Sequence, residues 1–96
     1  MDSYCYLTVT KRGIIIESTY DVRFVEELKT LIPHTARTWD PVEKKWTVDA
    51  AYTDDVKRLA CNYYDRVWLL EGGITTDLKT GETVNPMFDL IFEAEV

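Results

Sequence analysis

The stretch over residues 33–48 constrains the fold more than any other part of this chain, because it predicts a β-hairpin with one definite register. Asp40 and the proline after it suit the first two positions of a type I turn, since aspartate caps the turn and proline presets φ. If a four-residue loop follows Asp40, Trp39 faces Trp46 and Asp40 faces Lys45. Both indoles then lie on one side of the hairpin, with an Asp40–Lys45 charge pair on the other.

Another hairpin is predicted near the N-terminus. Residues 4–10 and 13–19 alternate and are rich in aromatic and β-branched side chains. Pairing Leu7 with Ile16 gathers the apolar side chains of both strands on one face, whereas a shift by one residue pairs Leu7 with Glu17. We therefore expect the first register, with the glycine at the turn because glycine tolerates positive φ.

Two amphipathic helices are predicted, each with an apolar stripe at helical spacing. The first begins near Val22, after a cap at Ser18 or Asp21, and ends before Pro33. The second begins somewhere between Ala50 and Asp54. The stripes consist of Phe24, Val25, Leu28, Leu31 and Ile32 in the first helix and of Tyr52, Val56, Leu59, Ala60 and Tyr63 in the second.

The rest of the chain favours further strands. Residues 67–70 form a continuous apolar run that is typical of a buried strand, and residues 74–84 are compatible with a hairpin that turns at Thr80-Gly81. Residues 86–96 are both apolar and acidic, and we interpret them as a C-terminal strand or tail.

These elements predict an α+β fold in a single domain over residues 1–85. An antiparallel sheet of about five strands, in the order ββαββαβ, packs two helices on one face. Each helix stripe needs such a face, or the other helix, to cover it. A chain of 96 residues with 46% hydrophobic content is large enough for one modest core.

Sequence features also bear on location. No apolar run reaches the roughly 18 residues of a membrane-spanning helix. The first residues lack a basic stretch followed by an apolar one, so we expect no signal peptide. Cys5 and Cys61 have neither metal-binding nor redox spacing, and we interpret them as reduced core thiols. We therefore expect a cytoplasmic protein without a membrane contact.

The net charge of −6 is unevenly distributed. Residues 1–48 carry seven basic and seven acidic side chains, whereas residues 49–96 carry four basic and ten acidic ones. An acidic protein is repelled by nucleic acid at long range, so any nucleic-acid contact is expected in the first half.

The residues that would indicate catalysis are missing from the sequence. His34 has no neighbouring Cys, His or carboxylate pair, which makes it a poor metal ligand. Neither serine lies in a nucleophile motif, and Gly72-Gly73 lacks the lysine of a phosphate-binding loop. We therefore expect no enzymatic activity, no cofactor and no bound metal.

The two indoles of the central hairpin have two interpretations. In the first, both indoles pack in the core against a helix, as large aromatic side chains usually do in small domains. Alternatively, Trp39 is partly exposed and stacks on a base while Arg37, Lys44 and Lys45 hold phosphates. The interpretations are compatible if Trp46 is buried and Trp39 is not.

An ordered set of residues links the first helix, the hairpin and the second helix: Pro33, Arg37, Trp39-Asp40-Pro41, Lys44-Lys45-Trp46 and, after an apolar residue, Tyr52. This set resembles the HARP module of annealing helicases over roughly residues 22–70. The resemblance implies recognition of forked DNA or of single-to-double-strand junctions, with the matching positions Arg37, Trp39, Asp40, Lys45 and Trp46. The chain differs from the family in lacking motor motifs and in having an acidic second half, which implies weak, salt-sensitive affinity.

Three functions are compatible with the sequence. The first is an accessory, non-catalytic module that binds single-stranded or branched DNA through Arg37, Trp39, Lys44, Lys45 and Trp46. The second is an acidic adaptor or inhibitor that binds a protein partner through its C-terminal half, with Met87, Phe88, Leu90 and Phe92 in the contact. The third is a structural protein or homodimer in which the same tail completes a sheet.

Overall fold

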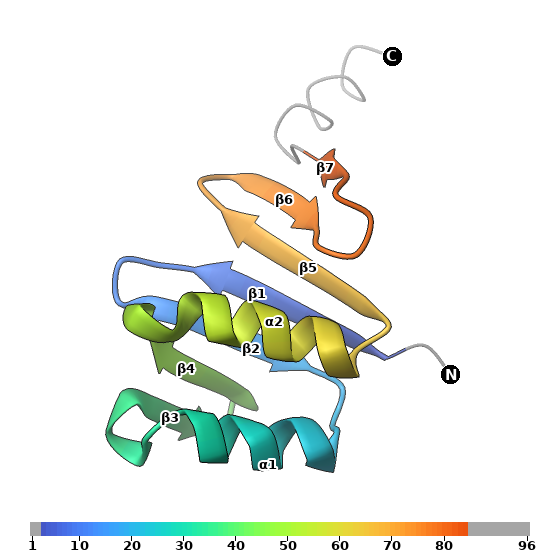
Figure 1. Cartoon of the computed structure of the whole chain (residues 1–96). Helices are drawn as coiled ribbons and strands as arrows, with labels where there is room; N and C mark the ends of the chain where they lie inside the picture. The colour runs from blue at the N-terminus through green and yellow to red at the C-terminus, as the bar shows by residue number, and fades with distance from the viewer. Residues whose placement is uncertain (1–2, 85–96) are drawn as a thin grey trace, which may run out of the picture.

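A computed structural model, which describes residues 3–84, shows an α+β fold with both helices on one face of a single sheet (Figure 1). The elements in order are β1 (Tyr4–Val9), β2 (Gly13–Ser18), α1 (Val22–Leu31), β3 (Arg37–Asp40), β4 (Lys45–Asp49), α2 (Thr53–Tyr63), β5 (Arg66–Glu71), β6 (Ile74–Asp77) and β7 (Thr83–Val84). Single 3-10 turns, His34–Ala36 and Ala50–Tyr52, precede β3 and α2. The predicted C-terminal strand or tail, residues 86–96, lies outside the described residues.

The sheet is mixed, so the prediction of a purely antiparallel sheet of about five strands is wrong. The strand order is β3-β4-β2-β1-β5-β6-β7. Neighbouring strands run antiparallel except β1 and β5, which are parallel and pair Tyr6 with Trp68 and Leu7 with Leu69. The chain crosses the helix-covered face through α2 before it enters β5, and such a crossover is what brings two strands together in parallel. The residues after β5 extend the sheet further through β6 and the two-residue β7.

The predicted hairpin registers are confirmed. Leu7 pairs with Ile16 between β1 and β2, and Trp39 pairs with Trp46 between β3 and β4. The segment over residues 74–84 also forms a hairpin, in which the Asp77 side chain accepts hydrogen bonds from two backbone N–H groups of the turn. Local pairing of this kind depends on turn chemistry and strand alternation, both of which are visible in the sequence.

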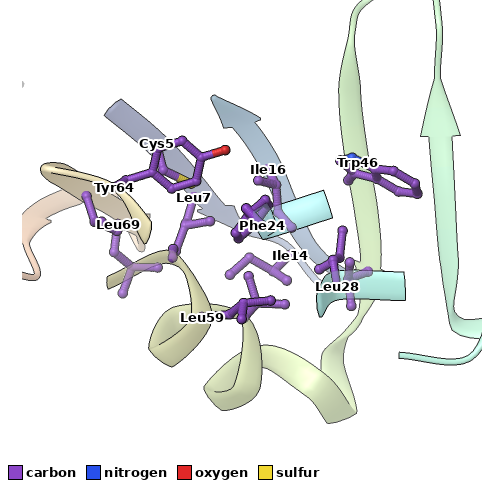
Figure 2. Packing of buried hydrophobic residues seen from close by; sticks show 14 of the residues in the cluster. Cys5, Leu7, Ile14, Ile16, Phe24, Leu28, Trp46, Leu59, Tyr64 and Leu69 are labelled. Atoms are coloured by element: carbon purple, nitrogen blue, oxygen red, sulfur yellow. The ribbon is translucent and has the colours of Figure 1, made fainter. Parts of the chain in front are cut away.

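The core lies between the sheet and the two helices (Figure 2). The predicted stripes supply much of it, since Phe24 and Leu28 of α1 and Leu59 of α2 are buried against β1 and β2. Leu31 departs from the prediction, because it lies on the outer side of the helix pair and is 43% exposed. The fully buried or nearly buried side chains are Cys5, Leu7, Ile14, Ile16, Phe24, Leu28, Ile32, Trp46, Val48, Val56, Leu59, Ala60, Tyr64, Val67 and Leu69.

Tyr64, directly after α2, belongs to the core although it is not part of the predicted stripe. Its ring packs edge-on against Phe24 with centroids 5.1 Å apart. Its hydroxyl donates to the Thr19 carbonyl at 2.8 Å and lies 3.0 Å from Ser18 Oγ. Burial raises the pKa of Tyr64 from 10.0 to about 12. The hydroxyl thereby joins the end of α2 to the segment that leads into α1.

Across residues 3–84, no helix combines the length and the apolar character needed to cross a membrane.

Candidate functional site

The β3–β4 hairpin is closed by the turn that the sequence predicts. The Asp40 side chain accepts hydrogen bonds from the N–H groups of Val42 and Glu43, at 2.9 and 3.1 Å. Lys44 ends the turn with a φ of 56°, a left-handed conformation that is uncommon for a residue other than glycine. The turn therefore fixes the backbone at Lys44, from which the side chain extends at the tip of the hairpin.

Trp39 and Trp46 face each other across this hairpin. Their ring centroids are 5.1 Å apart and the rings are tilted by 49°. Trp46 is 9% exposed because β4 lies inside the sheet, next to β2, whereas Trp39 is 45% exposed because β3 is the edge strand. One indole thus anchors the hairpin in the core, and the other presents an accessible aromatic surface. Figure 2 shows Trp46 at the margin of the buried cluster.

A pocket of about 790 Å³ opens between α1 and the hairpin. We call it the hairpin pocket. Five of its side chains are aromatic, and they include both indoles and Tyr64. Its complete lining is Ile16, Ser18, Tyr20, Asp21, Phe24, Val25, Lys29, Arg37, Trp39, Lys44, Trp46 and Tyr64.

The hairpin pocket is locally basic in an acidic protein. Its lining holds three cations, Lys29, Arg37 and Lys44, and a single carboxylate, Asp21. Among the described residues, neither lysine has an ion pair. An anionic ligand in this pocket would therefore meet a positive environment despite the net charge of −6.

Arg37 is held in place while part of its guanidinium stays available. Its Nε donates to the carbonyl of Ile32, at the end of α1, at 3.0 Å. Its Cζ lies 5.8 Å from the centre of the Trp46 ring, within reach of a cation–π contact. These two contacts orient the side chain, and its terminal nitrogens have no ion pair within residues 3–84. Such a positioned guanidinium suits a phosphate or carboxylate ligand.

Asp21 caps the N-terminus of α1. Its Oδ1 accepts from the N–H groups of Arg23 and Phe24, at 2.9 and 3.4 Å, as an N-cap. Loss of hydration at this position raises the pKa of Asp21, but these hydrogen bonds and the nearby Arg23 guanidinium lower the pKa overall. The carboxylate therefore stays charged at neutral pH and belongs to the helix rather than to a ligand.

Of the five residues predicted to contact nucleic acid, Lys45 alone does not line the hairpin pocket. It follows Lys44 but points to the opposite face of the sheet, as alternation along β4 requires. There its Nζ lies 3.8 Å from Glu17 Oε1 of β2. The predicted Asp40–Lys45 charge pair is thus replaced by a Lys45–Glu17 pair, because Asp40 turns back to cap its own turn.

Three residues of the pocket were not predicted from the sequence: Tyr20, Lys29 and Tyr64. Lys29 lies one helical turn after Val25, so its position on that side of α1 follows from the helix period. Which side of α1 faces the hairpin is set by tertiary packing, and no local pattern reports it. The four tail positions predicted for partner binding, Met87, Phe88, Leu90 and Phe92, lie outside the described residues.

Metal ligands do not gather in the described structure. No group of three or more His, Cys, Asp or Glu side chains within residues 3–84 has a geometry that could hold a metal ion. His34, in the 3-10 turn before β3, does not line the hairpin pocket. The features that remain for recognition are aromatic surface and positive charge.

Comparison with protein-family models, with curated proteins and with solved structures found no match for this chain.

Proposed function

We propose that this protein is a non-catalytic accessory module that binds single-stranded or branched DNA through the hairpin from Arg37 to Trp46. The observation that carries the proposal is the partly exposed Trp39 beside a pocket with three cations. Because Trp39 lies on the edge strand, part of its apolar surface stays in contact with water, whereas a core position would bury that surface. A ligand with flat aromatic groups and negative charge accounts for both features.

A nucleotide matches this combination. An unpaired base stacks on the exposed face of Trp39, and such stacking contributes about 1–3 kcal/mol per base with little sequence preference. The neighbouring phosphates are then held by Arg37 and Lys44, with Lys29 on the opposite wall of the hairpin pocket. A paired base inside a duplex hides its faces, so the pocket favours single strands, strand ends and junctions.

The electrostatics of the whole chain predict the character of this binding. The net charge of −6 repels DNA at long range, so association relies on the local cations of the hairpin pocket. If three cations each neutralise one phosphate of a single strand, the logarithm of the affinity falls with a slope of roughly −2 against the logarithm of salt concentration. Binding is therefore expected at low salt and strongly reduced at physiological salt.

The resemblance to the HARP module is part of the same proposal. The segment over residues 22–70 contains α1, the β3–β4 hairpin and α2, and the hairpin pocket lies between the first two of these elements. Of the matching positions, Arg37, Trp39 and Trp46 line the pocket, while Asp40 shapes the turn. The 96 residues contain no phosphate-binding loop for ATP, which favours recognition of a DNA structure over remodelling of it.

A titration of fluorescently labelled DNA tests this function directly. Fork, single-stranded and blunt duplex DNA of equal length are compared by anisotropy at low and at physiological salt, with tryptophan emission followed in parallel. The proposal predicts salt-sensitive binding with quenched emission, strongest for the fork and the single strand. Absence of binding at low salt, where attraction is greatest, would overturn it.

A further inference from the structure

The sheet face opposite the helices carries an exposed aromatic patch. Cys5 and Leu7 of β1 point into the core, so the alternating residues Tyr4 and Tyr6 point to the uncovered face, where they are 42% and 49% exposed. On the parallel strand β5, Trp68 lies beside Tyr6 and belongs to the same face. We call the residues Tyr4, Tyr6, Ile15, Trp68 and Leu70 the open-face patch.

This patch is separate from the hairpin pocket and is not suited to DNA. None of its residues lines the pocket, and the two surfaces lie on opposite faces of the sheet. The row that crosses the patch runs Asp77–Trp68–Tyr6–Glu17. Glu17 is paired with Lys45 of β4, and Arg66 of β5 lies beside Tyr4, so the rim of the patch carries both signs of charge. An apolar surface whose rim carries both signs of charge, without a cluster of cations, favours an apolar protein segment over a phosphate backbone.

The chain itself supplies such a segment close by. Val84, the last described residue, pairs with Thr75, which pairs with Leu70, which in turn pairs with Thr8 of β1. The chain therefore leaves the sheet in the same row as Leu70. The distance from β7 to β1 across the sheet is three strand spacings, about 14 Å.

The sequence that follows Val84 is apolar and is long enough to reach back to the open-face patch on β1 and β5. Within residues 87–92, only Asp89 is polar; the others are Met87, Phe88, Leu90, Ile91 and Phe92. The eight residues from Val84 to Phe92 span up to roughly 26 Å when extended, more than the distance to β1. A segment tethered this closely has an effective concentration near the millimolar range, which favours it over a free partner.

We propose that residues 87–92 of this chain cover the open-face patch, with their apolar side chains packed on Tyr6, Trp68 and Leu70. This contact accounts for a cluster of exposed aromatic side chains on an otherwise polar face. It is independent of the nucleic-acid proposal, because the covered face lies on the other side of the sheet from Trp39 and Lys44. Its occupant is the chain's own segment rather than a second copy or another protein.

Hydroxyl-radical footprinting with mass spectrometry tests the proposal on the full chain. The labelling rates of Tyr6 and Trp68 are compared between the unaltered protein and the double variant Phe88→Asp/Phe92→Asp. Asp89→Asn is the matched control, since it changes the same segment without removing an apolar side chain. Tyr20, 80% exposed on the helix side, is the internal reference for a folded protein.

The proposal predicts a severalfold rise in labelling of Tyr6 and Trp68 in the double variant and no change in the control. Equal labelling in all three proteins overturns it. So does protection that is lost on dilution, because this identifies a second copy as the occupant. A rise at Tyr6 and Trp68 that leaves DNA binding unchanged also confirms that the two surfaces act independently.

Discussion

Trp39 and Trp46 lie 5.1 Å apart, centroid to centroid, on paired positions of one hairpin, yet only Trp46 is buried. The difference comes from strand position, because β4 has a neighbour on each side while β3 is an edge. The same pair therefore combines the two interpretations that the sequence left open. Trp46 anchors the hairpin through burial, and its contact holds Trp39 in a fixed orientation at the mouth of the hairpin pocket.

Replacing each indole by alanine should separate stability from binding. Trp39→Ala is expected to lower stability by only about 1 kcal/mol, since roughly half of the side chain is exposed and an aromatic pair contributes that order. Its expected loss of DNA affinity is larger, about 1–3 kcal/mol for one stacked base. Trp46→Ala should instead cost roughly 3–5 kcal/mol of folding stability, because it opens a cavity in the core.

Urea denaturation and fork-DNA anisotropy on both variants check this prediction. A Trp39→Ala protein that is stable and still binds with unaltered affinity would contradict the stacking role of this residue. Trp39→Phe serves as the control, because a smaller ring retains an aromatic surface and should retain most of the affinity.

Lys44→Ala and Lys45→Ala form a matched pair that tests which face of the hairpin meets DNA. The two variants remove the same charge from adjacent residues, but Lys44 lines the hairpin pocket and Lys45 pairs with Glu17 on the opposite face. Lys44→Ala is expected to weaken low-salt binding by roughly 1 kcal/mol, about fivefold, in line with an exposed ion pair. It should also reduce the salt slope by about 0.7 for a single strand.

For Lys45→Ala, the expected change in affinity is much smaller, because only its long-range charge is lost. Anisotropy titrations over a range of salt concentrations give both quantities. Equal losses for the two lysines would show that the pocket is not the binding surface and that overall charge dominates.

Gly13→Ala should destabilise the fold through a backbone clash. At this position φ is 155°, and a Cβ atom would lie 2.0 Å from the Val48 carbonyl oxygen of the neighbouring strand. Because that oxygen belongs to the sheet, it cannot move away cheaply, and we expect a loss of at least about 2 kcal/mol. The midpoint of urea denaturation measures the effect.

Gly72→Ala is the appropriate comparison for the glycine experiment. Gly72 also has a positive φ, 61°, but no heavy atom would lie within 4 Å of its added Cβ. Its expected cost is only the left-handed backbone conformation, about 1 kcal/mol. A Gly13 variant that is no less stable than the Gly72 variant would refute the clash.

Tyr64→Phe should change the alkaline stability of the protein. The folded pKa of Tyr64, about 12, lies above its ordinary value of 10.0, so the folded state retains the phenolic proton where the unfolded state releases it. This contribution to stability is fully present below pH 10.0 and is lost as the pH rises toward about 12. The phenylalanine variant lacks this group and should show a shallower decline in stability above pH 10.0.

At neutral pH the same variant should be less stable by roughly 1–2 kcal/mol, because the Thr19 carbonyl loses its hydroxyl donor. Urea denaturation at neutral and at alkaline pH measures both effects. The pKa of Tyr63 is also raised, chiefly by its hydrogen bond to Glu27. Tyr63 is present in both proteins, so its contribution to the pH dependence of stability cancels in the comparison. Parallel pH profiles for the two proteins would argue against the proton linkage.

Local chemistry in the sequence was sufficient to predict the hairpins and the starts of the helices. Asp40 caps its turn, Asp21 caps α1, and alternation in β1 and β2 admits only one register with an apolar face. These features depend on residues close together in the chain, and each misregistered alternative would bury charge or expose apolar side chains. The order of helices and strands up to β5 was predictable for the same reason.

The candidate site was only partly predictable. Arg37, Trp39 and Trp46 were identified because they belong to one hairpin, whose register places them on one face. Lys29 lines the pocket because α1 packs beside the hairpin. Lys45 does not, because it lies on the opposite face of β4, next to Glu17. The position of Lys29 depends on how separate elements pack together, whereas the side of the hairpin on which Lys45 lies follows from alternation along β4.

The amino-acid sequence on its own specified the local units of this protein: the registers of its first two hairpins, the capping of α1, most of its apolar stripes and the acidity of its second half. Long-range packing was needed to place β5 parallel to β1, to leave Trp39 exposed while burying Trp46, and to join α1 to the hairpin around a basic pocket. The physical reason is that turns, caps and alternation act between residues a few positions apart. Strand order and exposure are instead set by which apolar faces bury each other across the whole chain.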